Sequence, residues 1–236
     1  MNILLTGASR GIGKAAYDAL RADGHKVVGQ STAGDGDLIA ADFTDPQAPR
    51  RLWEAAFEAL DQRIDVLINN AGVFEPIADN ASDEDWHAAW GRTMQINLQA
   101  SADLCRLAIA HFRSRPEDTP GRIVNVASRA AYRGDSPQHW HYAASKGAMV
   151  AMTKSIARGY AHENILAFAV CPGFTMTGMA EDYLDSRGGD KLLADIPLGR
   201  VADPSEIAET IRWLAVQAPA SATGAIIDVN GASFVR

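Results

Sequence analysis

Short apolar runs alternate along the chain with longer stretches in which apolar residues recur every three or four positions. The short runs predict strands at residues 3–5, 26–30, 38–41, 66–68, 123–127, 165–171 and 225–229. The longer stretches predict helices from about residue 12, from about Pro46, over 83–113 in two parts, over 140–162 and from Pro204. Neither pattern fits residues 73–82 and 129–139, which are expected to be loops.

This order of elements predicts a parallel sheet. Strands that alternate with amphipathic helices need crossover connections, which place helices on both faces of one sheet. The runs at 66–68, 123–127 and 165–171 are apolar throughout, as expected for strands that are buried on both faces. We therefore expect a single α/β domain over residues 1–236, with a doubly wound sheet of about seven parallel strands.

Composition excludes several classes of protein. The 236-residue chain carries a formal net charge of −7, which argues against a nucleic-acid partner. Its longest apolar run, 165–171, is too short to cross a membrane, and the first strand begins too close to Met1 for a signal peptide. Cys105 and Cys171 both lie in apolar patterns and are expected to be free thiols in a reducing compartment. We expect a cytoplasmic protein.

Glycines at positions 7, 11 and 13 form a turn between the first strand and the first helix. A strand, a glycine turn and a helix N-terminus in this order let backbone N–H groups meet a pyrophosphate. Without a Cβ atom, glycine also lets a ligand approach the main chain. A tight strand-to-helix turn that holds no ligand is the alternative interpretation.

Unusual residues also follow four later strands: Asp42, Asn69-Asn70, Ser128 and Pro172-Gly173. Ligands of parallel sheets bind beyond the carboxyl ends of the strands, and all these ends lie at one edge. Because the glycine turn lies at this edge as well, the sequence predicts one ligand site there.

Tyr142 and Lys146 are four residues apart in a predicted helix and so lie on the same face. Tyrosine titrates near pH 10, and a neighbouring lysine cation favours the phenolate and lowers the pKa of the phenol. Ser128 could hold a substrate carbonyl against this tyrosine. The alternatives are a solvated Tyr–Lys pair and a serine that only ends a strand.

In the order and spacing of its motifs, the chain resembles the short-chain dehydrogenase/reductase family over essentially its whole length. The motifs are Thr6-Gly7-Ala8-Ser9-Arg10-Gly11-Ile12-Gly13, Asn69-Asn70-Ala71-Gly72, Asn97, Ser128, Tyr142-x-x-x-Lys146 and Pro172-Gly173. Within the family, the nearest likeness is to 3-oxoacyl-(acyl carrier protein) reductase-like members. The resemblance implies a Rossmann-type domain that transfers a hydride between a nicotinamide cofactor and a carbonyl or secondary alcohol, with 3-oxoacyl thioesters among the candidate substrates.

The resemblance also implies a role for each catalytic residue. Tyr142 would donate the proton in reduction, and Ser128 would bind the carbonyl oxygen. Lys146 would hold the nicotinamide ribose and lower the pKa of Tyr142. Asn97 would position a water that links Lys146 to solvent. The alternative for Asn97 is a helix-interior asparagine that bonds to its own backbone.

A larger set of residues is implied to bind the cofactor. The members are Gly7, Ser9, Arg10, Gly11, Ile12, Gly13, Ser31, Thr32, Asp42, Phe43, Asn70, Ala71, Gly72, Tyr142, Lys146, Pro172, Gly173, Thr175 and Thr177. Residues 69–72 would line the adenine-ribose side and stabilise the central strand, and 172–177 would cover the nicotinamide. Asp42 would bond to the adenine amino group.

The end of the second strand favours NADP(H) over NAD(H). An NAD site normally has an acidic residue there for the ribose 2′-OH. This strand instead ends in Gly29-Gln30-Ser31-Thr32, whose polar side chains can donate to a 2′-phosphate, and Arg10 adds a cation. NAD(H) remains the alternative, because Asp35 or Asp37 could fold back toward a 2′-OH.

The remaining expectations concern the substrate and the assembly. Residues 174–200 are expected to form a substrate lid, with an ordinary exposed loop as the alternative. His139 and His141 flank Trp140, where no third ligand pattern stands nearby, so they are expected to line the substrate mouth or lie exposed, without a metal. Trp86 and Trp90 are expected to pack between helix and sheet or between subunits.

The resemblance further implies a homotetramer (or homodimer) built through the helices around 94–112 and 142–162 and through the last helix and strand. Two other functions stay open: an NAD-dependent alcohol dehydrogenase of the same fold, and a catalytically silent dinucleotide sensor.

Overall fold

The computed structural model describes residues 1–116, 119–176 and 193–236. It contains a seven-stranded sheet in the order β3-β2-β1-β4-β5-β6-β7, with every pair parallel. The strands are β1 (Asn2–Leu5), β2 (Lys26–Ser31), β3 (Ile39–Ala40), β4 (Val66–Asn69), β5 (Gly121–Val126), β6 (Ile165–Pro172) and β7 (Ile226–Val229). The doubly wound α/β fold expected from the pattern is confirmed.

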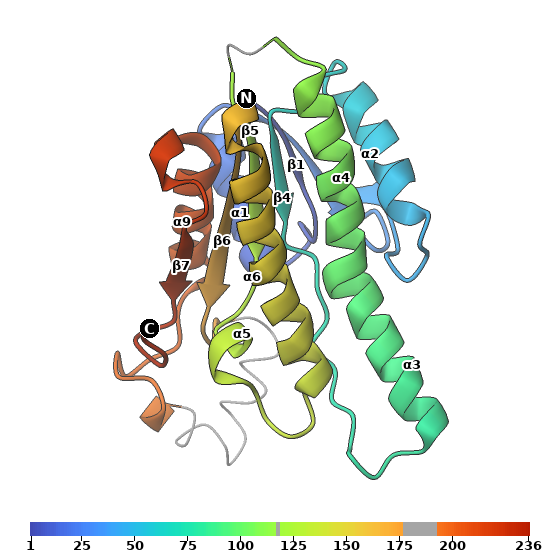
Figure 1. The fold of residues 1–236 in the computed structure, drawn as a ribbon, viewed down its shortest axis with the longest axis vertical. Coiled ribbons are helices and arrows are strands. Elements are labelled where there is room, and N and C mark those ends of the chain that lie inside the picture. The colour runs from blue at the N-terminus through green and yellow to red at the C-terminus, as the bar shows by residue number, and fades with distance from the viewer. Residues whose placement is uncertain (117–118, 177–192) are drawn as a thin grey trace.

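Helices cover both faces of this sheet (Figure 1). The α-helices are α1 (Gly11–Ala22), α2 (Ala48–Ala59), α3 (Asp83–Met94), α4 (Ala100–Arg113), α5 (Ala130–Arg133), α6 (Trp140–Tyr160) and α9 (Pro204–Val216). A π-helical turn (Gln95–Gln99) joins α3 to α4, and short 3-10 turns occupy Ala161–Glu163 and Ala220–Ala222. No described helix is long and apolar enough to cross a membrane.

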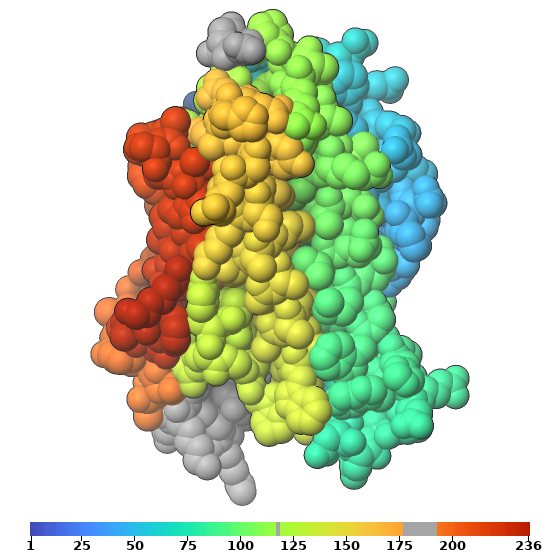
Figure 2. Space-filling view, viewed as in Figure 1, coloured from blue at the N-terminus to red at the C-terminus, as the bar shows by residue number. Residues whose placement is uncertain are grey.

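Alternating strand residues serve the two cores. Leu4 packs with α2, α4 and α6 on one face, whereas Leu5 packs with α1 and α9 on the other. In the space-filling view, α4 and α6 lie side by side on the front of the molecule (Figure 2). Register aligns Leu5 with Gly29 and Ile68, so the residues that follow β1, β2 and β4 lie at the same edge of the sheet.

The structure corrects the predicted boundaries in two places. The expected loop 129–139 contains α5, a helix too short to show a periodic apolar pattern; it begins where Ser128 Oγ accepts the Ala130 N–H at 3.1 Å and ends at Gly134, with φ +76°. The two expected helices over 83–113 are continuous through the π-helical turn. Most of the expected lid, 177–192, lies outside the described residues.

Candidate active site

Hydrogen bonds from β4 shape the glycine turn after β1. Thr6 Oγ1 accepts the N–H groups of Asn70 and Ala71, both at 3.0 Å. The Asn70 side chain donates to the carbonyls of Thr6 and Gly7, also at 3.0 Å. A Cβ atom on Gly13 would lie 1.9 Å from the Gly7 oxygen, so only glycine fits there. Asn70 therefore holds the turn in place, and its side-chain amide is already engaged within the protein.

The first turn of α1 is open to an anion. The helix begins at Gly11, and Arg10 before it has an extended backbone and makes no side-chain cap hydrogen bond. The first turn carries no acidic residue, and Ser9 and Arg10 are exposed. N–H groups and the helix dipole at such an end favour a phosphate. Ser9, Arg10, Gly11 and Ile12 thus lie where the sequence predicts.

Gln30 does not serve the role expected from the sequence. Its Oε1 accepts the Gly7 N–H at 2.9 Å, and its Nε2 donates to the Ala41 carbonyl at 2.7 Å. The side chain is buried and both of its polar atoms are bonded within the protein, which argues against a hydrogen bond from Gln30 to a ribose phosphate. Ser31 Oγ accepts the Gly34 N–H at 2.9 Å, and Thr32 is exposed. Ser31 and Thr32 remain at the predicted place.

The acidic alternatives near this strand differ in their availability. Asp37 accepts hydrogen bonds from Arg21 at 2.6 Å and Tyr17 at 3.0 Å, and the Arg21 contact lowers the pKa of its carboxyl. Asp37 is thus occupied on the outer face of α1, whereas Asp35 is exposed. A carboxylate for the ribose 2′-OH would have to come from Asp35.

Asp42 and Phe43 follow β3. Asp42 Oδ1 accepts the Thr44 N–H at 2.9 Å, which lowers the pKa of the exposed carboxyl. Asp42 can therefore accept a further hydrogen bond from a ligand. The Phe43 side chain is buried in the core, so only its backbone is available to a cofactor.

Lys146 carries a buried cation. Its Nζ donates to the Val126 carbonyl at 2.9 Å and lies 5.8 Å from the centre of the Tyr142 ring. Burial lowers the pKa of Lys146 to about 8. A Cβ atom on Gly72 would lie 3.4 Å from Nζ and 3.3 Å from Asn97 Oδ1. The missing side chain of Gly72 leaves open the space beside the ammonium.

The Tyr142 phenol is a weaker acid in this structure than a hydrated tyrosine. Burial raises the pKa of its phenol to about 12, and an interaction with the Ser128 hydroxyl acts in the opposite direction. The prediction that Lys146 brings the pKa of Tyr142 below its usual value is therefore wrong for the protein without ligands. Desolvation of the phenol is the largest cause of the raised pKa, and the interaction that opposes it comes from Ser128.

Asn97 lies in the π-helical turn and is fully buried. Its Oδ1 accepts the Val73 N–H at 2.8 Å, and its Nδ2 donates to the Val73 carbonyl at 3.0 Å. A further bond of 3.2 Å reaches Ser145 Oγ, next to Lys146. The alternative of an asparagine side chain bonded to its own helix is wrong, because the side chain joins three segments of the site.

The end of β6 closes the same edge. The Pro172 carbonyl accepts the Arg129 N–H at 3.0 Å, which ties this strand to the residue after Ser128. Gly173 donates to the Val229 carbonyl at 2.9 Å, and a Cβ atom there would lie 2.8 Å from Asn230 Cα. Thr175 is buried and donates to the Gly173 carbonyl. Thr177 lies outside the described residues.

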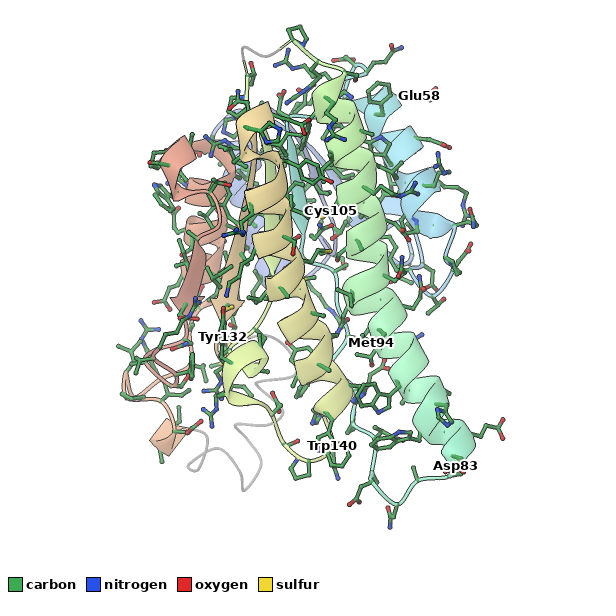
Figure 3. The ribbon with its side chains drawn as sticks, in the orientation of Figure 1. Glu58, Asp83, Met94, Cys105, Tyr132 and Trp140 are labelled. Carbon is green, nitrogen blue, oxygen red and sulfur yellow. The ribbon has the colours of Figure 1, made fainter. Side chains whose placement is uncertain are left out.

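Aromatic residues complete the site beyond these motifs. Sequence reasoning missed Phe74, whose ring centre is 4.7 Å from that of Tyr142; its place two residues after Gly72 was the available signal. His139 stacks on Phe74, whereas His141 is fully buried, so the expectation of an exposed or mouth-lining position is wrong for His141. Trp140 is half exposed and marks this end of α6 in Figure 3.

Trp86 and Trp90 pack on the start of α6. The ring centre of Trp86 lies 5.5 Å from that of Trp140, and that of Trp90 lies 5.9 Å from that of His141. Their contact is therefore between α3 and α6. In the described part of the chain, no three His, Cys, Asp or Glu side chains gather as a metal site.

Asn69 is turned away from the site. Its side chain is buried and donates to Asn125 Oδ1 at 2.8 Å and to the Cys105 sulfur at 3.3 Å. The expectation that the Asn69 side chain lines the adenine-ribose side is wrong, because it lies inside the core between β4, β5 and α4. Its bond to Asn125 agrees with the expectation that this segment stabilises the central strand. Burial raises the pKa of Cys105 to about 12 and that of Cys171 to about 11, so both thiols stay protonated.

Comparison with known proteins identifies a family to which the sequence is similar. A family model described as enoyl-(acyl carrier protein) reductase matches residues 7–232. The chain is 33% identical over 244 residues to a 3-oxoacyl-[acyl-carrier-protein] reductase of Vibrio cholerae, covering 98% of this chain and 96% of the relative.

Solved structures show the same fold. A 3-ketoacyl-(acyl-carrier-protein) reductase from Brucella melitensis complexed with NADH superposes with a TM-score of 0.86 at 26% identity, covering 99% of this chain and 98% of that one. A blue fluorescent protein from a metagenomic library, in complex with NADPH, gives a TM-score of 0.86 at 30% identity, covering 99% and 97%. The chain belongs to the short-chain dehydrogenase/reductase family of oxidoreductases.

Proposed function

We propose that the protein reduces ketones, including 3-oxoacyl groups, with Tyr142 as the proton donor. The observation that carries this proposal is the buried Lys146 ammonium one helical turn from the Tyr142 phenol, at the sheet edge that also holds Ser128. A purely structural lysine has little reason to be buried beside a tyrosine and opposite a glycine.

The residues around Lys146 fit a nicotinamide ribose. An ammonium has three donors, and within the described parts of the chain Nζ donates only to the Val126 carbonyl. Two donors remain for ribose hydroxyls in the space that Gly72 leaves open. When bound, the nicotinamide supplies the hydride. The open first turn of α1 fits the pyrophosphate of the same cofactor.

Proton transfer follows from the protonation states of the site. With a pKa of about 12, Tyr142 holds its proton at neutral pH and can donate it to a carbonyl oxygen. Ser128 interacts with the same phenol and can donate a second hydrogen bond to that oxygen. Lys146, charged below pH 8, stabilises the phenolate that remains.

The cofactor proposed is NADP(H). Arg10, Ser31 and Thr32 offer a cation and two hydroxyls near the ribose side, while Asp37 is occupied by Arg21. The Brucella relative is complexed with NADH and the metagenomic relative with NADPH, so relatives of this fold bind either form. Affinities for NADPH and NADH, measured again in Arg10→Ala, test this choice: equal affinities that the substitution leaves unchanged would contradict it.

The substrate proposed is a small carbonyl compound. We include 3-oxoacyl thioesters because relatives are named 3-oxoacyl- or 3-ketoacyl-(acyl-carrier-protein) reductases. We also place the protein in the cytoplasm as a homotetramer or homodimer. The proposed subunit contact includes the groove between α4 and α6, which Ile109, Ile156 and Arg106 line, together with α9 and β7. We propose the same roles as before for the other catalytic, cofactor-binding and lid residues that the sequence predicts. Thr177 is among them.

NADPH oxidation against a panel of ketones, quinones and short 3-oxoacyl thioesters tests the activity. Tyr142→Phe should lower turnover by at least about 100-fold, because general acid catalysis contributes about 10²–10⁴-fold. Turnover within a few fold of wild type would contradict the mechanism. Tight NADPH binding without turnover of any carbonyl would instead favour the catalytically silent sensor.

A further inference from the structure

Two aromatic rings form a stacked pair beside Tyr142, which we call the aromatic wall. The rings of Phe74 and His139 stack with their centres 3.9 Å apart and their planes within 5°. The Phe74 ring also meets the Tyr142 ring in an edge-on contact of 4.7 Å at 81°. Phe74 follows β4, while His139 precedes α6, so two separate segments build the wall at the phenol.

Hydrogen bonds at neighbouring residues fix both rings. Asn97 holds both backbone groups of Val73, the residue before Phe74. The Ile77 N–H donates to the Gln138 carbonyl at 3.0 Å, which joins the two segments. The imidazole of His139 is oriented by a contact of 2.7 Å between its Nδ1 and Ser136 Oγ. The stack is therefore built before a substrate arrives.

The wall is uncharged at neutral pH. Burial lowers the pKa of His139, with Asp135 acting against it and His141 with it, so the imidazole is neutral. The neighbouring cation Arg92 is paired with Glu75 at 3.1 Å. Trp140, the residue after His139, is half exposed and contacts Trp86, with ring centres 5.5 Å apart at 81°.

We propose that Phe74 and His139 determine substrate specificity by packing against a flat aromatic group attached to the substrate carbonyl. This inference rests on the proposed function. A carbonyl whose oxygen reaches the Tyr142 phenol brings its substituent next to the wall. A planar ring can meet the outer face or the edges of this stacked pair, which adds attraction beyond the area that it buries. A saturated ring with the same number of carbons lacks that attraction.

The experiment compares two ketones of matched size, acetophenone and cyclohexyl methyl ketone. The ratio of their kcat/KM values is measured for wild type, Phe74→Leu and His139→Leu, so that intrinsic reactivity cancels between proteins. Phe57→Leu is the control, because Phe57 also contacts a histidine, His111, with ring centres 5.2 Å apart. It precedes Glu58, which lies at the opposite end of the molecule from Trp140 (Figure 3).

Phe74→Leu and His139→Leu should each lower the preference for the aryl ketone by about 2- to 10-fold, which is the stacking contribution expressed as a ratio of rates. Phe57→Leu should leave it unchanged. An unchanged ratio in both wall variants overturns the inference and leaves the proposed function standing. Wild-type protein that reduces neither ketone nor any other carbonyl overturns the proposed function itself.

A folding defect is separated from loss of the wall by a binding measurement. The inhibition constants of benzamide and cyclohexanecarboxamide are compared in each variant, together with its thermal unfolding midpoint. Loss of preference for benzamide in a variant with an unchanged midpoint supports the inference. Equal loss of affinity for both amides contradicts it.

Discussion

Asn97 holds Val73 by both of its backbone groups, accepting its N–H at 2.8 Å and donating to its carbonyl at 3.0 Å. The same side chain reaches Ser145, which precedes Lys146 on α6. The π-helical turn therefore connects the segment after β4 to the helix that carries Tyr142 and Lys146. Asn97 acts on the site at least partly as a positioning residue.

Replacing Asn97 with leucine should cost about 1–3 kcal/mol of the free energy of unfolding, because buried polar groups on Val73 and Ser145 lose their partner. Turnover should fall by more than the loss of stability explains. Val73 lies between Gly72 and Phe74, so a shift of its backbone also moves these two residues of the site. Urea unfolding and kcat measure the two effects. Gln99→Ala, exposed in the same π-helical turn, should change stability by less than about 0.5 kcal/mol; an equal effect of both variants would contradict the role.

The rate of reduction should depend on the protonation of Lys146. Below its pKa of about 8 the ammonium stabilises the phenolate that forms on Tyr142, and above it that charge is lost. Tyr142, with a pKa of about 12, keeps its proton over this range. We expect kcat for reduction to fall as the pH rises through about 8. Lys154→Met, which removes an exposed lysine of the same helix, should keep the profile, and a kcat that is flat from about pH 7 to 9.5 would refute it.

The free energy of unfolding should depend on pH because the Lys146 charge is buried. The pKa of Lys146 is lowered from 10.5, so the native state binds fewer protons than the unfolded state between about pH 8 and 10.5. Stability conferred at this site rises with pH over that window. At pH 7, Lys146→Met should therefore be more stable than wild type by about 1–3 kcal/mol without cofactor, although inactive. The gain should shrink toward pH 10.5, and a gain that is constant with pH would contradict the assignment.

The sheet, and the edge at which the candidate site residues lie, could be predicted because they follow from local patterns. Apolar runs mark strands, and parallel strands bring their carboxyl ends to one edge, so Ser128 and Pro172 fall at the same edge as the glycine turn wherever their side chains point. What side chains contact depends on neighbours distant in sequence. From the sequence, Gln30 is a polar residue near a strand end, whether it binds a ligand or the protein itself. Its contact with the Gly7 N–H follows from the register of β2 against β1.

The burial of individual polar side chains is a second property that the hydrophobic pattern of the sequence does not predict. A lysine four residues from a tyrosine predicts a lowered phenol pKa only where its charge outweighs desolvation of the phenolate, and burial of the phenol is the largest influence on the pKa of Tyr142. Phe74 and His139 meet through segments that show no regular pattern, so no periodicity could predict their stack. Helix α5 is likewise hidden, because four residues hold no full amphipathic repeat.

Gly72→Ala should weaken cofactor binding with little effect on the fold. The added Cβ would lie 3.4 Å from Lys146 Nζ and 3.3 Å from Asn97 Oδ1, where the proposed ribose hydroxyls bind. We expect the Kd for NADPH to rise about tenfold, equivalent to about 1.4 kcal/mol. Gly91→Ala is the matched control, since a Cβ there meets nothing within 4 Å. Titration by NADPH fluorescence measures both, and equal affinities in the two variants would exclude Gly72 from the site.

Gln30→Leu tests whether the glycine turn depends on β2 for its shape. The change leaves the Gly7 N–H and the Ala41 carbonyl without their side-chain partner, at a cost of about 1–3 kcal/mol in the free energy of unfolding. Because Gly7 begins the turn that we propose holds the pyrophosphate, affinity for NADPH and NADH should fall by the same factor, without a change of preference between them.

The direct alternative, in which Gln30 contacts the ribose 2′-phosphate, gives a different result. It predicts that Gln30→Leu weakens NADPH more than NADH, whereas burial of the amide between Gly7 and Ala41 predicts equal loss. Gln47→Leu, at an exposed glutamine before α2, controls for the loss of a side-chain amide and should change neither affinity. A selective loss of NADPH in Gln30→Leu would mean that this amide leaves Gly7 when the cofactor binds.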